Sequence, residues 1–244
     1  MYLIRLCYDG TAYSGYQRQK NSRTVGQELL SAAEAVFGEV KRFAGCSRTD
    51  SGVHAYDYAV SFSAAKPLSP DTVVRAMNAN LPEDISVYSC RIVPDDFHAR
   101  YSVISKEYVY NIYTGEVRSP FYGKYSLFYP RDIDILLVDK GLKKFEGRHD
   151  FRSFMASGSK ITDTVRTVFS SHVEKDGEMV RIYIEADGFL YNMVRIIIGT
   201  LLGLNENKIS LDDIDKIIEK KDRKFAGRTV PAYGLFLNRV NYGQ

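Results

Sequence analysis

Residues 40–62 read VKRFAGCSRTDSGVHAYDYAVSF, and this stretch decides the arrangement of the first half of the chain. Its two ends, Val40–Ala44 and Ala55–Phe62, are rich in apolar and aromatic side chains, which predicts two strands. The residues between them are polar and include glycines, which predicts a connecting loop. The stretch therefore supplies the second and third strands of this half, and the other elements lie on either side of it.

The elements that flank this stretch complete a known order. Tyr2–Tyr8 alternates like a strand, and Asp9-Gly10-Thr11 ends it with turn residues. Val25–Phe37 has apolar side chains at helical spacing, which predicts a helix. Pro70–Asn80 predicts a second helix and Ile85–Ile92 a fourth strand. The resulting order, βαββαβ, is that of the ferredoxin-like unit.

After Pro94-Asp95-Asp96 the same plan starts again. The pattern predicts strands at Lys106–Tyr113, Thr164–Glu174, Met179–Ala186 and Leu235–Tyr242, and helices at Ile135–Phe145, Leu190–Leu202 and Leu211–Lys220. We therefore expect an α+β protein of two ferredoxin-like domains, residues 1–97 and 98–244, whose antiparallel sheets flank a central basic cleft. One larger α+β domain with insertions remains the alternative.

Composition narrows the class of protein. The 244 residues are 45% hydrophobic and 26% charged, which is ordinary for a globular protein, and the net charge of +3 permits a polyanionic partner without requiring one. No apolar run approaches the ~20 residues that cross a bilayer, and the first residues lack the features of a signal peptide. We therefore expect a cytoplasmic protein with no membrane contact. Cys7, Cys46 and Cys90 are odd in number and far apart, which is unlike a disulfide framework or a zinc site.

The densest polar stretch of the first half is the predicted loop Gly45–Ala55. It contains Arg48, Asp50 and His54 together with hydroxyl side chains, and its glycines allow backbone conformations closed to other residues. Such a loop is either a demanding turn or a site. Spacing alone slightly favours a simple turn through Asp50. The chain has no phosphate-binding glycine loop, dinucleotide fingerprint or paired-histidine metal helix, so we expect neither a cofactor nor a metal.

This loop resembles the signature loop of the tRNA pseudouridine synthase A family. Other segments resemble that family in the same order along nearly the whole chain: Tyr8–Gln19, Asn78–Pro82, Asp95–Arg100, Lys106–Tyr110, Asp150–Phe154, Arg166–Val168, Phe189–Arg195 and Pro231–Leu235. The chain departs from the family pattern at Tyr16, where tryptophan is usual, and at Cys46 and Ser51, where alanine or glycine is commoner. These departures leave the acid, the arginines and the tyrosine in place.

The resemblance implies an isomerase that converts uridine to pseudouridine at positions 38, 39 and 40 of the tRNA anticodon stem-loop. It implies Asp50, Tyr108 and Arg195 as the catalytic residues. Asp50 would attack either C1′ of the ribose or C6 of the base, and the sequence does not choose between them. Tyr108 would stack on the flipped base and is a candidate to take up the C5 proton. Arg195 would lie within ion-pairing distance of Asp50 and hold it ionised.

The resemblance also implies the RNA contacts and the assembly. Arg48 would fill the space that the flipped base leaves, or hold the phosphate of the flipped nucleotide. Further contacts to RNA are expected from Gln17, Arg18 and His54, and Tyr108 would contribute through its stacking surface. A homodimer that binds tRNA without a cofactor is expected.

Two other functions fit parts of the pattern. A non-catalytic tandem RNA-binding module would use exposed strand aromatics such as Tyr108 and Tyr110, but the glycine-aromatic strand motif of such modules is missing. A carboxylate-dependent hydrolase would need a second acid, Asp95 or Asp96, at a defined distance from Asp50. These two acids follow Pro94 and are more typical of a turn.

Overall fold

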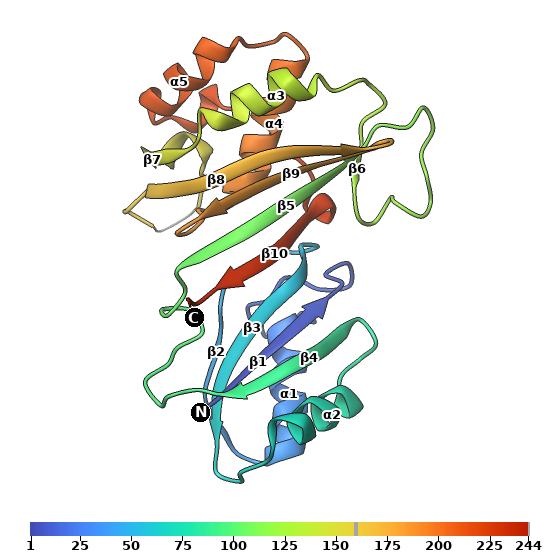
Figure 1. Cartoon of the computed structure of the whole chain (residues 1–244), viewed down its shortest axis with the longest axis vertical. Coiled ribbons are helices and arrows are strands. Elements are labelled where there is room, and N and C mark those ends of the chain that lie inside the picture. Colours follow the sequence, from blue (N-terminus) through green and yellow to red (C-terminus); the bar gives the residue numbers. More distant parts are fainter. Residues whose placement is uncertain (159–160, 244) are drawn as a thin grey trace. The chain divides into compact units, whose positions relative to one another are not determined.

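The structure is a computed structural model that describes residues 1–158 and 161–243. The chain forms two compact units. Unit 1 contains Met1–Ile104 and the segment from Phe236 on, and unit 2 contains Ser105–Leu235. Both units mix helices with mostly antiparallel strands, which confirms the α+β class at this coarser level (Figure 1).

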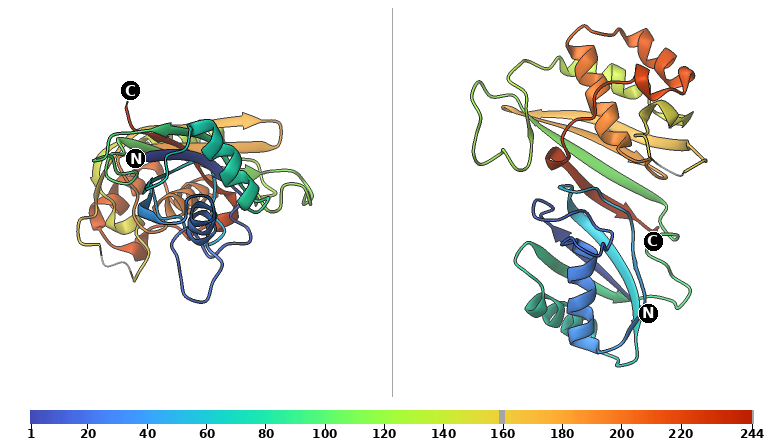
Figure 2. Two further views of the ribbon diagram at one scale, coloured as in Figure 1. Left: turned by 90° about the horizontal axis from the view of Figure 1, so that it is seen from below. Right: turned by 180° about the vertical axis from the view of Figure 1, so that it is seen from behind.

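Unit 1 contains the elements β1 (Tyr2–Tyr8), α1 (Val25–Phe37), β2 (Val40–Gly45), β3 (His54–Ala64), α2 (Pro70–Asn80) and β4 (Ile85–Ile92). Strand β1 lies between β3 and β4 and is antiparallel to both, and β2 pairs with β3 on its other side. The two helices lie on one face of this sheet (Figures 1 and 2). The core between them contains the packed rings of Tyr2, Phe37 and Phe62. Helix α2 begins where Ser69 accepts a hydrogen bond from the Thr72 backbone and Pro70 occupies the first turn.

Unit 1 contains two stretches outside the predicted N-terminal domain, residues 1–97: residues 98–104 and the segment from Phe236 on. Ala99 donates its backbone N–H to Ser61 Oγ at 3.0 Å, and the Tyr242 hydroxyl donates to the Ala99 carbonyl at 2.6 Å. Strand β10 (Leu235–Asn241) runs parallel to β3, with Phe236 opposite His54 and Leu237 opposite Ala55. The last strand of the chain therefore joins the sheet that the first residues begin, because pairing with β3 satisfies its backbone groups.

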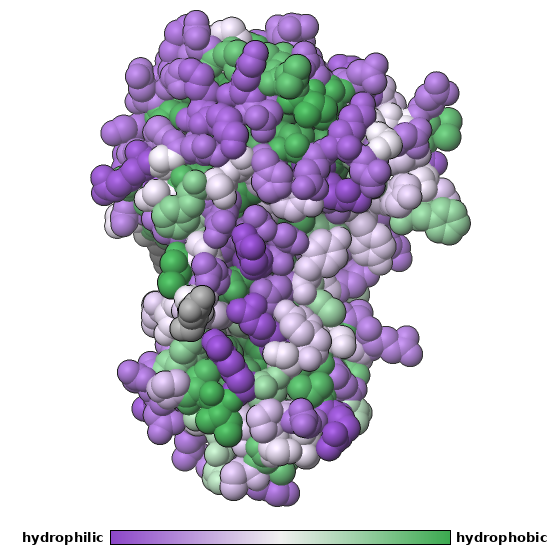
Figure 3. Space-filling model, in the orientation of Figure 1, coloured by the Kyte–Doolittle hydropathy of each residue, from purple (hydrophilic) through white to green (hydrophobic). Residues whose placement is uncertain are grey.

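Unit 2 contains β5 (Ser105–Tyr113), β6 (Leu127–Phe128), α3 (Ile135–Lys143), β7 (Gly147–Asp150), β8 (Val165–Asp176), β9 (Met179–Ala186), α4 (Met193–Asn205) and α5 (Leu211–Lys220), with short 3₁₀ helices at Phe151–Phe154, Arg223–Phe225 and Ala232–Gly234. Its strands follow the order β5-β9-β8-β7 with antiparallel neighbours, and β6 adds a short parallel pair to β5. The helices lie on one face of this sheet (Figures 1 and 2). Apolar side chains reach the surface near α3, where Leu136 is largely exposed (Figure 3).

Most predicted elements of unit 2 are present, and the additional ones are short. Strands β6 and β7 and the 3₁₀ helices were not predicted, since segments of two to four residues carry too little periodicity to be recognised. Helix α4 is almost entirely buried, as its continuous apolar sequence indicates. Gly141 of α3 allows the two helices to approach closely, because a Cβ at this position would clash with Leu204.

Candidate functional site

Residues 46–53, which we call the 46–53 loop, connect β2 to β3 and are tied to β3 at their start. The Cys46 N–H donates to the Ala59 carbonyl at 2.9 Å, and the Tyr58 hydroxyl donates to the Ser47 carbonyl. Cys46 and Tyr58 are fully buried, and Tyr16 packs on Tyr58 with ring centroids 4.7 Å apart. The start of the loop is therefore supported by the packed rings of Tyr16 and Tyr58.

The segment Tyr13–Tyr16 holds the 46–53 loop on both sides of Asp50. Before Asp50, the Thr49 carbonyl accepts from the Tyr16 N–H at 3.2 Å. After Asp50, the Tyr13 carbonyl accepts from the Gly52 N–H at 3.3 Å and from the Ser51 hydroxyl at 3.2 Å. Asp50 itself is half-buried. Because the residues next to it are anchored, the backbone that carries this carboxylate has little freedom.

The close approach of these two segments requires glycine. Gly15 has a φ of +85°, and a Cβ at this position would overlap the Thr49 carbonyl. A Cβ on Gly10 would likewise overlap the Val53 carbonyl. The sequence drew attention to the glycines of the loop, whereas the glycines that face it from the N-terminal segment were missed. Only the fold brings them to this place.

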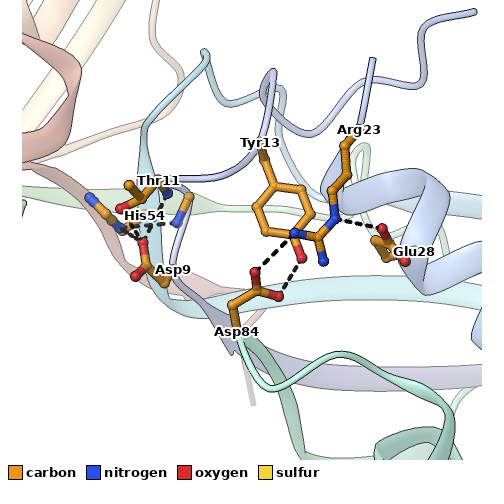
Figure 4. Close-up of polar contacts among 8 residues, drawn as sticks. Asp9, Thr11, Tyr13, Arg23, Glu28, His54 and Asp84 are labelled. Carbon is orange, nitrogen blue, oxygen red and sulfur yellow. Dashed lines mark hydrogen bonds and ion pairs between the residues drawn. The ribbon is translucent and has the colours of Figure 1, made fainter. Parts of the chain in front are cut away.

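His54 is the first residue of β3 and is almost fully buried. Its Nδ1 accepts a hydrogen bond from the Gly10 N–H at 3.0 Å and lies 3.1 Å from the Asp9 carboxylate (Figure 4). Its ring also stacks on Phe236 at 4.5 Å. These contacts support a role in holding the turn after β1, and the contact of His54 with RNA stays a prediction.

The other predicted RNA-binding residues of unit 1 are exposed. Arg48 lies in the 46–53 loop two residues before Asp50, and Gln17 and Arg18 lie in the segment that follows Tyr13–Tyr16. Exposed guanidinium groups suit phosphate binding, because a phosphate can approach them from solvent and accept two hydrogen bonds from their planar fork.

Tyr108 lies in β5 opposite Ile184 of β9 and is 6% exposed. Its ring packs edge-on against Phe189, with centroids 4.9 Å apart. Tyr110, two residues on, is fully buried, and its hydroxyl donates to the Pro231 carbonyl at 2.9 Å. Burial raises the pKa of Tyr110 well above its usual value. Since the Tyr110 ring is not an exposed platform, the alternative of a simple RNA-binding module loses one of the two strand aromatics on which it depended.

Arg195 is half-buried near the start of α4. Its Nε donates to the Val230 carbonyl at 2.7 Å and its Nη1 to Asn192 Oδ1 at 2.6 Å. Asn192 precedes the helix in a left-handed conformation, with a φ of +60°. These two acceptors, which the sequence did not indicate, fix the plane of the guanidinium. The ion pair of Arg195 with Asp50 stays a prediction.

The acids of the hydrolase alternative lie in a turn, as their sequence indicates. The Phe97 N–H donates to the Pro94 carbonyl at 3.1 Å, and the exposed Asp95 carboxylate binds the N-terminal amine at 3.1 Å. This ion pair gives Asp95 a local structural role.

Three further features concern metal binding, membrane spans and disulfide bonds. Within residues 1–158 and 161–243, no group of three or more His, Cys, Asp or Glu side chains is arranged to hold a metal ion. The same residues contain no helix that is long and apolar enough to span a membrane. In this part of the chain, Cys7, Cys46 and Cys90 form no disulfide bond.

Comparison with known proteins places the chain in a family. A family model described as tRNA pseudouridine synthase matches residues 6–102 and 142–243. The tRNA pseudouridine synthase A of Clostridium kluyveri is 42% identical over 236 residues, which cover 96% of each chain. The proteins of the same name from Clostridium acetobutylicum and Geobacillus kaustophilus are each 41% identical, over 98% and 97% of this chain and 98% and 92% of their own. The chain therefore belongs to the tRNA pseudouridine synthase family and is an isomerase that acts on tRNA.

Proposed function

We propose that this protein converts uridine to pseudouridine at positions 38, 39 and 40 of the tRNA anticodon stem-loop, with Asp50 as the nucleophile and the target base flipped out of its stack. The observation that carries the proposal is the anchoring of the backbone on both sides of Asp50 by Tyr13 and Tyr16. A nucleophile held in one place reacts faster than a mobile one, because less entropy is lost on reaching the transition state.

The reaction breaks one bond and forms another without any change in composition. The N1–C1′ bond breaks, the freed uracil rotates, C5 bonds to C1′, and the proton on C5 is removed. Asp50 adds either to C1′, and this bond breaks when C5 bonds to C1′, or to C6, and this bond breaks when removal of the C5 proton restores the C5–C6 double bond. N1 takes up a proton in place of the one lost from C5. Either route is covalent catalysis by a carboxylate. A carboxylate close to C1′ also stabilises the positive charge that develops on the ribose.

Recognition in this proposal begins with the RNA backbone. Arg48 fills the space of the flipped base or binds the phosphate of its nucleotide, while Gln17 and Arg18 contact the RNA nearby. All three side chains are exposed, which supports these roles. His54 holds the turn at Gly10 through a hydrogen bond. Its proposed contact with RNA requires this turn to rearrange.

Unit 2 contributes Tyr108 and Arg195. Tyr108 contacts the flipped base and its hydroxyl accepts the C5 proton, which is general base catalysis. Arg195 pairs with Asp50, as the family resemblance implies. The hydrogen bonds to Val230 and Asn192 orient this half-buried guanidinium, and a fixed orientation supports directional pairing with a carboxylate.

The protein acts as a cytoplasmic homodimer in this proposal, with no cofactor. Its oligomeric state is measured by light scattering after size-exclusion chromatography. A monomer with full activity would remove the homodimer from the proposal and leave the chemistry in place.

The test uses four unmodified tRNA transcripts, one with uridine at positions 38, 39 and 40 and three with a single uridine at one of these positions. Pseudouridine is mapped by chemical labelling and primer extension after incubation with the protein. We expect modification at all three positions by the wild type and none by Asp50→Ala. Modification confined to another part of the tRNA would overturn the proposed positions.

A further inference from the structure

Tyr13 connects the 46–53 loop to a cluster of charged side chains that the reaction has not so far required. We call Tyr13, Arg23, Glu28 and Asp84 the Tyr13 cluster (Figure 4). The Tyr13 hydroxyl donates to Asp84 Oδ1, and Arg23 Nη1 donates to Asp84 Oδ2 at 3.3 Å. The Arg23 guanidinium lies over the Tyr13 ring, 4.5 Å from its centroid, and its Nε donates to Glu28 at 2.9 Å.

The side chain and the backbone carbonyl of Tyr13 contact different parts of unit 1. Its ring, which is 2% exposed, is held by Asp84 and Arg23. Its carbonyl accepts from both residues that follow Asp50, Ser51 and Gly52. Since one residue joins these contacts, a displacement of the ring also displaces the carbonyl on which the loop rests.

Asp84 is in turn fixed to the sheet. Its carbonyl accepts from the Asp9 N–H at 2.9 Å, and it directly precedes the first residue of β4. Burial, together with the hydrogen bond to Asp84, raises the pKa of the Tyr13 hydroxyl above its usual value. The phenol therefore stays protonated and remains a donor at neutral pH.

Arg23 extends the same cluster to the proposed RNA contacts. Its carbonyl accepts from the Ser14 N–H at 2.9 Å, which closes the excursion of the chain that carries Gln17 and Arg18. The base of this excursion and the support of the 46–53 loop thus depend on one set of side chains.

We infer that Tyr13 is a positioning residue for the isomerisation: its hydroxyl, bound to Asp84, sets the place of the carbonyl that holds Ser51 and Gly52, and thereby the place of Asp50. The inference rests on the proposed role of Asp50 as the nucleophile. In this role Tyr13 acts on the reaction only through the position of Asp50.

Unit 1 contains a second cluster in which a tyrosine and an arginine both donate to one aspartate, which provides a matched control. The Tyr88 hydroxyl donates to Asp57 Oδ1 at 2.5 Å, and Arg5 Nη1 donates to Asp57 Oδ2 at 2.5 Å. This cluster holds β10, because Asp57 accepts from the Val240 N–H at 2.9 Å. Tyr13→Phe and Tyr88→Phe therefore each remove one phenol–carboxylate hydrogen bond, but only the first bond supports the 46–53 loop.

The experiment compares Tyr13→Phe, Asp84→Ala and Tyr88→Phe with the wild type, and Asp50→Ala gives the level of no reaction. Three quantities are measured for each protein: the single-turnover rate with saturating enzyme, the Kd for tRNA, and the melting temperature. Rates are taken well below the lowest melting temperature, because buried Tyr13 and half-exposed Tyr88 differ in what their hydroxyls contribute to stability.

We expect Tyr13→Phe to lower the single-turnover rate about 10-fold, since a small misplacement of a reacting group costs one to two orders of magnitude. The Kd for tRNA should change less than about 2-fold, because most of the affinity comes from phosphate contacts. Tyr88→Phe should keep the wild-type rate. Tyr13→Phe combined with Asp84→Ala should be no slower than Asp84→Ala alone, since both changes break the same bond.

A wild-type rate for Tyr13→Phe, or an equal loss of rate in Tyr88→Phe, would overturn the positioning role. Asp84→Ala, which removes the acceptor of the Tyr13 hydroxyl, decides the question in the same way if Tyr13→Phe does not fold. Turnover by Asp50→Ala would instead contradict the proposed nucleophile, so the two failures are distinguishable.

Discussion

Asp50 is the residue on which the proposed chemistry depends most directly. Replacing it by Asn or Ala should lower pseudouridine formation by at least about 10³-fold, because no other group in the proposal forms the covalent bond. Affinity for tRNA should stay within about 2-fold, since binding draws mostly on phosphate contacts. The rate is followed by release of tritium from C5-labelled tRNA, and affinity by filter binding.

Asp96→Asn is the control for Asp50→Asn. Asp96 is an exposed acid in the turn after Pro94, and the hydrolase alternative would need it or Asp95. We expect its substitution to leave the rate unchanged. Turnover by Asp50→Ala above the level of an empty-vector preparation would remove Asp50 from the mechanism.

Two substitutions of Tyr108 distinguish the contribution of its ring from that of its hydroxyl. Tyr108→Phe should keep tRNA affinity and lower the rate about 10²-fold or more, which is the usual contribution of a general base. Tyr108→Leu should weaken both, because the ring that packs on Phe189 is lost. The measurements are single-turnover rates and Kd values.

Tyr113→Phe is the matched substitution in the same strand. The Tyr113 hydroxyl donates to Glu178 at 2.9 Å at the end of β5, so its removal should affect stability alone. If Tyr108→Phe reacts at the wild-type rate, its hydroxyl is not the acceptor of the C5 proton and Tyr108 is at most a contact surface.

At the scale of elements, the support of the 46–53 loop depends on a backbone position that no side chain can occupy. Gly15→Ala should lower turnover strongly, because the new Cβ would displace the Thr49 carbonyl beside Asp50. It should also destabilise the fold by more than the ~1–2 kcal/mol that a left-handed backbone costs a residue with a Cβ. Chemical denaturation and single-turnover rates measure the two effects.

Gly38→Ala is the control that isolates the backbone term. Gly38 ends α1 with a φ of +78°, close to the φ of Gly15, but nothing lies within 4 Å of a Cβ built there. We expect it to cost about 1–3 kcal/mol in stability and nothing in rate. Equal rates for the two alanine variants would show that the contact of Gly15 with Thr49 does not position Asp50.

At the scale of the whole molecule, the proposal assigns a catalytic role to Arg195, a residue of unit 2. Arg195→Met should lower turnover more than tRNA affinity, because a cation that keeps Asp50 ionised is lost. A nearby cation lowers the pKa of a carboxyl group, so its removal raises that pKa. The acidic limb of the rate profile should therefore move to higher pH, and activity should be lost earlier as the pH falls.

Arg195→Lys tests charge against geometry. Lysine keeps the positive charge but loses the planar arrangement that reaches Val230 and Asn192 together. We expect a slower enzyme whose acidic limb stays closer to that of the wild type than the limb of Arg195→Met. An acidic limb that is the same in Arg195→Met and the wild type would remove Arg195 as the partner of Asp50.

The sequence by itself determined the elements whose pattern is local. The predicted bounds of Tyr2–Tyr8, Val25–Phe37, Pro70–Asn80 and Ile85–Ile92 are confirmed, because the periodicity of side chains within a segment reports which of its faces is buried. The loop around Asp50 was recognisable for a similar reason, since its residue types stand together in the chain. The family membership that this loop and the later segments indicated is confirmed as well.

Only the tertiary structure decided which distant segments of the chain are in contact. Pairing of β10 with β3 joins residues 236 and 54, the approach of Gly15 to Thr49 joins two loops, and the bond of Tyr13 to Asp84 joins residues 71 positions apart. The burial of His54 follows from the same contacts. None of these has a local pattern, because a contact between distant segments depends on how the whole sheet is ordered. The support of Asp50 therefore becomes visible only when the chain is folded.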